Sequence, residues 1–169
     1  MTDTVLYELA TRAGRALAQR GWMMATAESC TGGWIAEAVT MVPGSSAWFD
    51  RGFVTYTYAS KREMLGVSQA TLDRFGAVSQ EVVEEMTAGA LKSSDAQIAI
   101  AVSGTAGPGG GTADKPVGTV CLAWGVRNQA TRSETVYFEG DRESVRRQSV
   151  IRALEVLSEI VEGERGDGK

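Results

Sequence analysis

Residues 97–102 read Gln-Ile-Ala-Ile-Ala-Val, the clearest buried strand in this chain of 169 residues. A short, continuous apolar run of this kind is typical of a strand that is covered on both faces. Upstream of it, segments with helical spacing alternate with short strand-like runs. Downstream, two strand-like segments follow one another without a helix between them. This order predicts a layered α/β domain around a largely parallel, mixed sheet.

Working outward from this strand gives the remaining elements. The sequence predicts helices at residues 3–20, 34–41, 60–66 and 68–75, and two longer helices capped by Ser79 and Asp141. Strands are expected at residues 22–27, 53–58, 97–102, 118–126 and 131–138. The core face of the last helix would consist of Val145, Val150, Leu154, Leu157 and Val161. We expect one domain over residues 1–162 and a flexible tail over residues 163–169.

Composition excludes several classes of site. Histidine is absent, which rules out a Ser-His-Asp triad, a Cys-His pair and a histidine-ligated metal. The two cysteines, Cys30 and Cys121, lie far apart and form no metal-binding or disulfide framework, which fits a reducing, cytoplasmic compartment. The net charge of −4 argues against nucleic acid as a partner. No signal peptide is evident, and no apolar run is long enough to predict a membrane span.

A polar segment, Glu28-Ser29-Cys30-Thr31-Gly32-Gly33, lies between an expected strand and a helix. At such a junction, backbone N–H groups and the positive end of the helix dipole point at whatever lies in front of it. Ser29 is therefore a candidate nucleophile for acyl transfer, with free amides to hold an oxyanion. A Cys30 thiolate is the alternative nucleophile, since a helix N-terminus can lower a thiol pKa. The purely structural interpretation makes Ser29 or Thr31 a helix N-cap.

A lysine ends the segment Tyr56-Thr57-Tyr58-Ala59-Ser60-Lys61. In a chain without histidine, Lys61 is the obvious base for a serine. An ordinary lysine pKa leaves only about one side chain in a thousand neutral near pH 7, so burial or a neighbouring cation such as Arg51 or Arg62 must lower that pKa by about 3 units. Alternatively, Lys61 stays charged and stabilises a tyrosinate at Tyr56 that takes the serine proton. The structural interpretation is a surface lysine beside core tyrosines.

The segment from Ser103 to Pro116 has no expected secondary structure, which is long for a plain connection. Its hydroxyls and bare amides suit a phosphate or a sugar, although neither the P-loop nor the dinucleotide-binding pattern can be read in it. At the start of the last helix, positive charge opposes the helix dipole, and a bound anion would relieve it. That basic cluster consists of Arg142, Arg146 and Arg147. A flexible loop and a solvated helix face are the structural alternatives.

Five motifs together resemble one family, the CinA C-terminal domain family. They are A-E-S-C-T-G-G at 27–33, P-G-S-S-A-W-F-D-R-G-F-V-T-Y at 43–56, A-V-S at 77–79, S-G-T-A-G-P-G-G-G with K-P-V-G-T-V at 103–120, and G-D-R-E-S-V-R-R-Q at 140–148. The resemblance runs from about residue 5 to residue 160. It implies a three-layer α/β/α sandwich on a mostly parallel, mixed sheet of five strands.

The stand-alone members of this family are nicotinamide-nucleotide amidohydrolases. The resemblance therefore implies hydrolysis of nicotinamide mononucleotide to nicotinate mononucleotide and ammonia, in pyridine-nucleotide recycling, with no metal and no cofactor. The family's catalytic group maps to Ser29, Tyr56 and Lys61. Backbone amides for the oxyanion would come from Cys30, Thr31, Gly32 and Gly33. The ribose phosphate would be held by Thr105, Gly107, Gly109, Gly110, Arg142, Arg146 and Arg147.

The chain departs from the family at position 58. The family usually has a small polar residue there, often asparagine, where this chain has Tyr58. On the expected strand Tyr58 shares a face with Tyr56, so it would narrow the pocket or compete for the tyrosine role. The alternative function of a different class is a non-catalytic nucleotide-binding or protein-interaction module, which would bind ligand without releasing ammonia. Small enzymes of this sort are usually symmetric homo-oligomers, and we expect one here.

Overall fold

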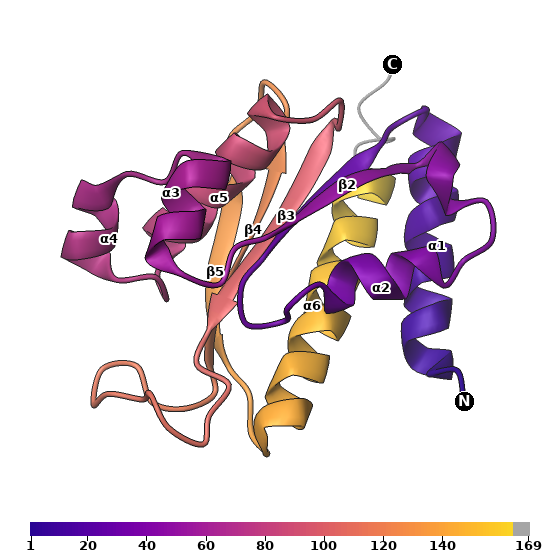
Figure 1. Ribbon diagram of the computed structural model, residues 1–169. Coiled ribbons are helices and arrows are strands. Elements are labelled where there is room, and N and C mark those ends of the chain that lie inside the picture. Colours follow the sequence, from indigo (N-terminus) through magenta and orange to yellow (C-terminus); the bar gives the residue numbers. More distant parts are fainter. Residues whose placement is uncertain (164–169) are drawn as a thin grey trace.

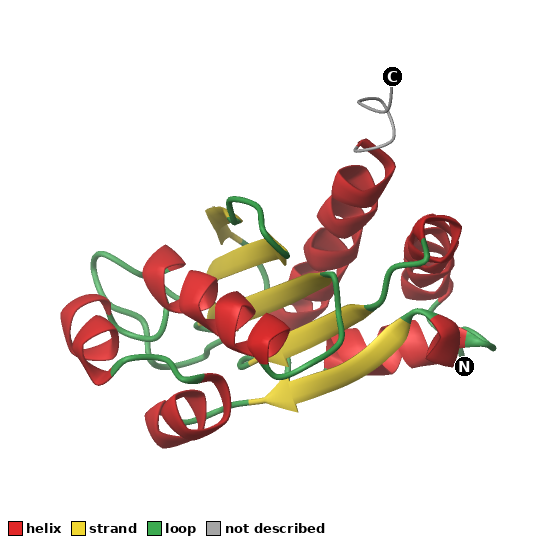
Figure 2. Ribbon diagram, turned by 90° about the horizontal axis from the view of Figure 1, so that it is seen from above, coloured by secondary structure: helices red, strands yellow, loops and turns green. Residues whose placement is uncertain are grey.

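The computed structural model describes residues 1–163, in which a five-stranded sheet lies between two layers of helices (Figures 1 and 2). The strands are β1 (Met24–Glu28), β2 (Phe49–Val54), β3 (Ile98–Gly104), β4 (Thr119–Val126) and β5 (Arg132–Tyr137). The helices are α1 (Thr4–Arg20), α2 (Trp34–Thr40), α3 (Tyr58–Leu65), α4 (Gln69–Phe75), α5 (Gln80–Lys92) and α6 (Arg142–Gly163), with a short 3-10 turn at Ser45–Ala47. The expected tail lies outside the described residues, apart from Gly163, which ends α6.

The sheet is mixed, as the sequence predicts. Its strand order is β2-β1-β3-β4-β5, with β1 parallel to both of its neighbours. Strand β4 runs antiparallel to β3 and to β5, so four of the five strands point in one direction. Helices α1, α2 and α6 cover one face of the sheet, and α3, α4 and α5 cover the other (Figure 1). Over residues 1–163, no helix combines the length and apolar composition needed to cross a membrane.

The two faces of the sheet differ in the size of their side chains. Along β3, Ile98, Ile100 and Val102 join the larger apolar cluster under α1, α2 and α6. The alternate residues, Ala99 and Ala101, join the smaller cluster under α3, α4 and α5. Strands β1 and β4 add further small residues to that second face, namely Ala25, Ala27, Cys121 and Ala123. Small side chains let a helix approach a sheet closely, so α5 packs close to the strands on this face.

Helices α5 and α3 also pack closely against each other. A Cβ atom at Gly89 would overlap the backbone carbonyl of Leu65, the last residue of α3. A Cβ at Gly125 of β4 would lie 3.0 Å from Thr87 of α5. Glycine at position 89 therefore sets the distance between the two helices, and with it the position of α3.

The expected strand over residues 53–58 is wrong in its bounds, because β2 ends at Val54 and Tyr58 begins α3. Thr57 and Ser60 form a reciprocal capping box: the Ser60 amide donates to Thr57 Oγ1 at 3.1 Å, and the Thr57 amide donates to Ser60 Oγ at 3.0 Å. This cap starts a helix where tyrosine and threonine favour a strand. Tyr56 and Tyr58 therefore do not share a strand face.

The other expected elements are present, with ends that differ by a few residues. Ser79 caps α5 by accepting from the Val82 amide at 3.2 Å. Asp141 caps α6 by accepting from the Ser144 amide at 2.9 Å. The expected core residues of that last helix, Val145, Val150, Leu154, Leu157 and Val161, are all buried.

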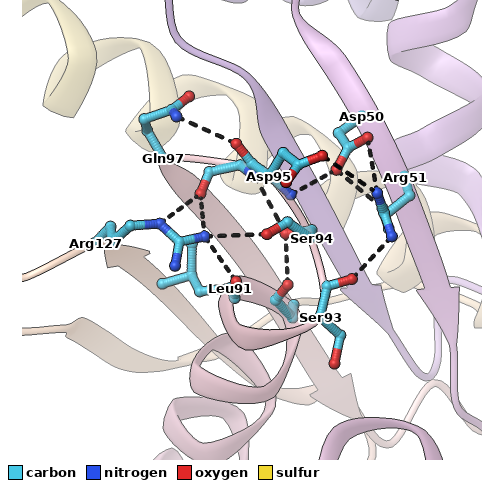
Figure 3. Close-up of polar contacts among 10 residues, drawn as sticks. Asp50, Arg51, Leu91, Ser93, Ser94, Asp95, Gln97 and Arg127 are labelled. Carbon is cyan, nitrogen blue, oxygen red and sulfur yellow. Dashed lines mark hydrogen bonds and ion pairs between the residues drawn. The ribbon is translucent and has the colours of Figure 1, made fainter.

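A polar network closes one end of the sheet (Figure 3). The guanidinium of Arg127, just after β4, donates to the carbonyl groups of Leu91 and Ala96 at 2.7 Å. Asp50 of β2 accepts from the Asp95 amide at 2.9 Å and pairs with Arg51. The segment between α5 and β3 is thereby tied to β2 and to the end of β4. The carboxyl ends of β1, β2 and β3 lie at the opposite end, where the turn after β1, the loop after β3 and the start of α6 meet (Figure 1).

We expect Gly89→Ala to lower the free energy of unfolding by about 1–3 kcal/mol, because the added methyl group overlaps Leu65. This loss should exceed the gain of about 1 kcal/mol in helix propensity that alanine brings. Urea denaturation followed by circular dichroism measures the difference. Gly109→Ala, where nothing lies within 4 Å of the added atom, is the control and should change stability little. A Gly89→Ala variant as stable as the wild type would contradict the close approach of α3 and α5.

Candidate active site

Ser29 and Lys61 meet at the carboxyl ends of the central strands. Ser29 follows β1 directly, and its amide donates to Val102 of β3 at 3.0 Å. Lys61 lies in the first turn of α3, and its ammonium donates to Ser29 Oγ at 2.9 Å and to the Thr55 carbonyl at 2.6 Å. Both side chains are buried, with Lys61 only 1% exposed. The two residues that the sequence singled out separately therefore form one hydrogen-bonded pair, and the interpretation of Lys61 as a surface lysine is wrong.

Burial lowers the pKa of Lys61 to about 8, against an opposing influence from Cys30. The neighbouring arginines that the sequence suggested do not supply this effect: Arg51 pairs with Asp50, and Arg62 donates to Gln69 at 2.6 Å. With a pKa about one unit above neutrality, about one lysine in ten carries no charge at pH 7. A neutral amine keeps its donor bond to Thr55 and presents its lone pair to Ser29, which is the geometry of a general base.

Glu28 organises the turn that carries Ser29, a role that the sequence analysis missed. Its carboxylate is fully buried and accepts from the Thr31 hydroxyl at 2.7 Å and from the amides of Ile35 and Ala36 at 2.8 and 3.1 Å. The carboxylate thus satisfies the first amides of α2, whose N-cap position is Gly33, with no side-chain cap. Neither Ser29 nor Thr31 is a helix N-cap, which removes the structural interpretation of this segment.

The backbone after Ser29 offers unpaired donors. Within the described residues, the amides of Cys30, Thr31 and Gly33 donate to no other residue, whereas the Gly32 amide donates to the Ser29 carbonyl at 3.0 Å. Gly32 and Gly33 adopt positive φ angles of 61° and 101°, which glycine tolerates best. Of the four amides expected from the sequence, only that of Gly32 is engaged with another residue, and those of Cys30 and Thr31 directly follow Ser29, where a developing oxyanion would form.

Cys30 is a poor alternative nucleophile. Burial raises the pKa of its thiol to about 11, and the Glu28 carboxylate adds to the shift. The thiol therefore keeps its proton at neutral pH. Since the thiolate is the reactive form, this environment favours Ser29.

Tyr56 lies at the rim of the site and is 60% exposed, so it is no core residue. Its hydroxyl accepts from Arg142 Nη2 at 3.0 Å, while Arg142 Nη1 donates to the Gly107 carbonyl at 2.8 Å. Arg142 therefore links the start of α6 to the glycine-rich loop and to Tyr56. Because Lys61 bonds directly to Ser29, the contacts favour the lysine amine over a Tyr56 tyrosinate as the proton acceptor.

These groups surround a cavity of about 160 Å³. Its lining residues are Ser29, Cys30, Tyr56, Lys61, Ala77, Val78, Ser103, Gly104, Ala106 and Arg142. Ser103 is a second residue that the sequence analysis did not single out: it is 2% exposed, and its hydroxyl has no partner in the described part of the chain. A larger hollow, of about 520 Å³, lies along α1 and contains no comparable nucleophile–base pair.

The remaining expected residues divide into near and distant groups. The Thr105 amide donates to Thr119 at 2.9 Å, which fixes the base of the glycine-rich loop, and only the Gly107 carbonyl contacts Arg142. Gly109 and Gly110 are exposed, farther along the loop. In the described part of the chain, no contact joins either glycine to Ser29.

Only one of the three arginines lines the cavity. Arg146 donates to the carbonyl groups of Cys30 and Thr31 at 3.0 and 3.2 Å and lies over the Trp34 ring. It therefore stabilises the turn that follows Ser29. Arg147 pairs with Asp3 at 2.8 Å, at the start of α1. Neither of these two side chains is among the residues that line the cavity, which leaves Arg142 as the arginine at the cavity.

Tyr58 lies outside the cavity lining, contrary to the expectation that it narrows the pocket. As the first residue of α3 it points toward the segment between α4 and α5, where its hydroxyl accepts from the Ala77 amide at 3.4 Å. The acidic and cysteine side chains of residues 1–163 form no cluster that could hold a metal ion.

Comparison with known proteins shows the family of this chain. Residues 6–161 match the CinA C-terminal domain family. The nicotinamide-nucleotide amidohydrolase PncC of Pseudomonas putida is 57% identical over 152 residues, covering 90% of this chain and 94% of that protein. The PncC of Escherichia coli K12 is 50% identical over 157 residues, covering 93% and 95%.

Solved structures share the fold. The competence/damage-inducible protein CihA of Agrobacterium tumefaciens superposes with a TM-score of 0.88 at 50% identity, covering 90% of this chain and 93% of that one. A CinA superfamily protein of Klebsiella pneumoniae gives a TM-score of 0.90 at 44% identity, covering 94% and 98%. The three-layer α/β/α prediction is therefore confirmed, and this chain belongs to the CinA C-terminal domain family.

Proposed function

We propose that this chain is an amidohydrolase that converts nicotinamide mononucleotide to nicotinate mononucleotide and ammonia, through an ester on Ser29. The observation that carries the proposal is the buried contact of 2.9 Å between Lys61 Nζ and Ser29 Oγ, together with the lowered pKa of Lys61. A serine beside a lysine that can lose its proton is an activated nucleophile. The names of the PncC relatives support the choice of a nicotinamide nucleotide as substrate.

In the first half of the reaction, Ser29 Oγ bonds to the carboxamide carbon while the Lys61 amine takes the hydroxyl proton. The amides of Cys30 and Thr31 hold the oxyanion that forms on the carbonyl oxygen. The Lys61 ammonium then gives its proton to the leaving nitrogen, the C–N bond breaks, and ammonia departs. The product of this half is a seryl ester of the nicotinate ring.

In the second half, water attacks the ester carbon and Lys61 takes a proton from the water. The same proton returns to Ser29 Oγ as the ester bond breaks, which restores the pair; the second proton of the water leaves the new carboxylic acid for solvent, and the carboxylate departs. One side chain thus acts as base and then as acid in each half, which requires a lysine pKa close to the working pH.

The size of the cavity indicates how the substrate would lie. A cavity of about 150 Å³ holds a benzene-sized ring, so the 160 Å³ here suits the pyridine carboxamide alone. The ribose phosphate would then lie outside it, beside Arg142 and the loop that begins at Thr105. Arg142 is exposed and has a planar, charged fork suited to a phosphate. Such a reaction would serve the recycling of pyridine nucleotides.

We expect Ser29→Ala and Lys61→Met each to lower ammonia release from nicotinamide mononucleotide by at least about 10³-fold, because one removes the nucleophile and the other the base. Purified protein with a coupled ammonia assay measures the rate. Cys30→Ala, which keeps the backbone amide, and Lys92→Met, an exposed lysine on α5, are the controls and should keep most of the activity. A wild-type chain that binds the nucleotide without releasing ammonia would identify a binding module instead.

We expect kcat/KM to rise about tenfold per pH unit below pH 8 and to level off above it, because only the neutral Lys61 amine can take the serine proton. Rate measurements between pH 6 and 9.5 give the profile. If Lys61 is the acceptor, Tyr56→Phe should leave the midpoint in place even where it lowers the rate. A midpoint that shifts or disappears in Tyr56→Phe would favour a tyrosinate as the base, and a flat wild-type profile would contradict both.

A further inference from the structure

Residues 75–78, here called the pocket wall, end with two residues that line the cavity. Ala77 and Val78 line the cavity together with Ser29 and Lys61. The pocket wall joins the end of α4 to the N-cap of α5 and includes Gly76, whose φ of 74° makes a turn. Beyond Phe75, the last residue of α4, this segment lies outside the helices and strands, so other groups must hold its backbone in place.

The first of these groups is Lys115, from the far side of the glycine-rich loop. Its ammonium donates to the Phe75 carbonyl at 2.6 Å, at the C-terminal end of α4. Carbonyl groups in the last turn of a helix lack intrahelical donors, and a cation is favourable there. Lys115 is itself held in a turn, in which the Thr112 amide donates to the Lys115 carbonyl at 2.9 Å.

The second group is Tyr58, whose hydroxyl accepts from the Ala77 amide at 3.4 Å. A Cβ atom placed on Gly76 would lie 3.9 Å from both Lys115 Nζ and the Tyr58 hydroxyl, so the two side chains reach the pocket wall at the same residue. The remaining hydrogen bonds are local: the Ser79 hydroxyl donates to the Gly76 carbonyl at 2.8 Å, and the Gly76 amide donates to the Leu72 carbonyl at 2.9 Å. Within residues 1–163, the two long-range hydrogen bonds of the pocket wall therefore come from Lys115 and Tyr58, beside the apolar packing of Ala77 and Val78.

We propose that Lys115 and Tyr58 are positioning residues that fix the pocket wall and thereby set the affinity of the cavity for the aromatic carboxamide of the substrate. This inference rests on the proposed function. Neither side chain contacts Ser29 or Lys61 in any recorded hydrogen bond, so their loss displaces the surface against which the ring packs and leaves the reacting pair intact.

The same contacts fix the glycine-rich loop near its beginning and near its end. Arg142 bonds to the Gly107 carbonyl near the beginning of the loop, and Lys115 bonds to Phe75 near its end. The loop is therefore fixed at one point beside the cavity mouth and at a second point on the pocket wall.

The test is steady-state kinetics with nicotinamide mononucleotide on Lys115→Met, Tyr58→Phe and the double variant. For Lys115→Met we expect KM to rise roughly tenfold with kcat within about twofold of the wild type, because a charged hydrogen bond to the wall is lost. For Tyr58→Phe, which removes only the hydroxyl, we expect a rise of about two- to threefold. Lys92→Met is the matched control, and Lys115→Arg, which can reach the same carbonyl, should recover most of the affinity.

Hydrogen exchange of the segment around residues 75–79, without substrate, provides a readout that does not depend on activity. The amides of this segment should exchange faster in Lys115→Met than in the wild type and in Lys92→Met. A Lys115→Met variant with unchanged KM, or one that lowers kcat at unchanged KM, overturns the inference, even if its thermal stability falls. If the wild type releases no ammonia, the proposed function is wrong, and unchanged exchange in Lys115→Met would then overturn this inference separately.

Discussion

The amine of Lys61, buried where the parallel strands end, is the constraint on which the rest of the site depends. A charged group removed from water is costly unless it is paired, and here its partners are a carbonyl and a hydroxyl and no carboxylate. The position of the amine follows from two local features. The capping box of Thr57 and Ser60 starts α3 three residues after β2, and Gly89 lets α5 hold α3 close to the sheet. Together they place the Lys61 side chain beside Thr55 and within hydrogen-bond distance of Ser29. The close packing of α3 and α5 on the alanine-rich face of the sheet therefore determines the geometry of the Ser29–Lys61 pair.

Ser29, the proposed nucleophile, is held by an independent arrangement on the other side of the sheet. Glu28 is the last residue of β1, and its carboxylate binds the first amides of α2 and the Thr31 hydroxyl. Arg146 of α6 binds the carbonyl groups of Cys30 and Thr31. With its carbonyls and side chains occupied in this way, the turn after Ser29 is rigid, while the amides of Cys30 and Thr31 stay unpaired. A rigid turn with unpaired donors is what an oxyanion requires, since donors that are already oriented need no reorganisation when charge develops.

Much of this could be predicted from the sequence, and what could not has a physical reason. Apolar periodicity gives the helices and the central strands, and the absence of histidine leads to Lys61 as the base. The end of β2 was mispredicted because β propensity at Tyr56 and Tyr58 competes with a two-residue cap that only local geometry reveals. Of the two causes that the sequence suggests for a lowered Lys61 pKa, burial is the one that acts, because Arg51 and Arg62, the adjacent arginines, contact other groups. Ser103 and the pocket wall depend on contacts between segments far apart in the chain, which no spacing rule encodes.

Burial that makes Lys61 useful as a base also affects the stability of the fold. In the unfolded chain its pKa is near 10.5, and in the folded chain it is about 8. Between these two values the unfolded chain binds more protons, so this group makes the fold more stable as the pH rises through the interval. Below pH 8 the cost is present in full, on the order of 3 kcal/mol for a difference of 2.5 in pKa. At neutral pH the surrounding packing must therefore offset this free-energy cost of burying the lysine, which a methionine at position 61 would avoid. A lysine at this buried position thus costs stability, and its use as a proton acceptor gives a reason for that cost.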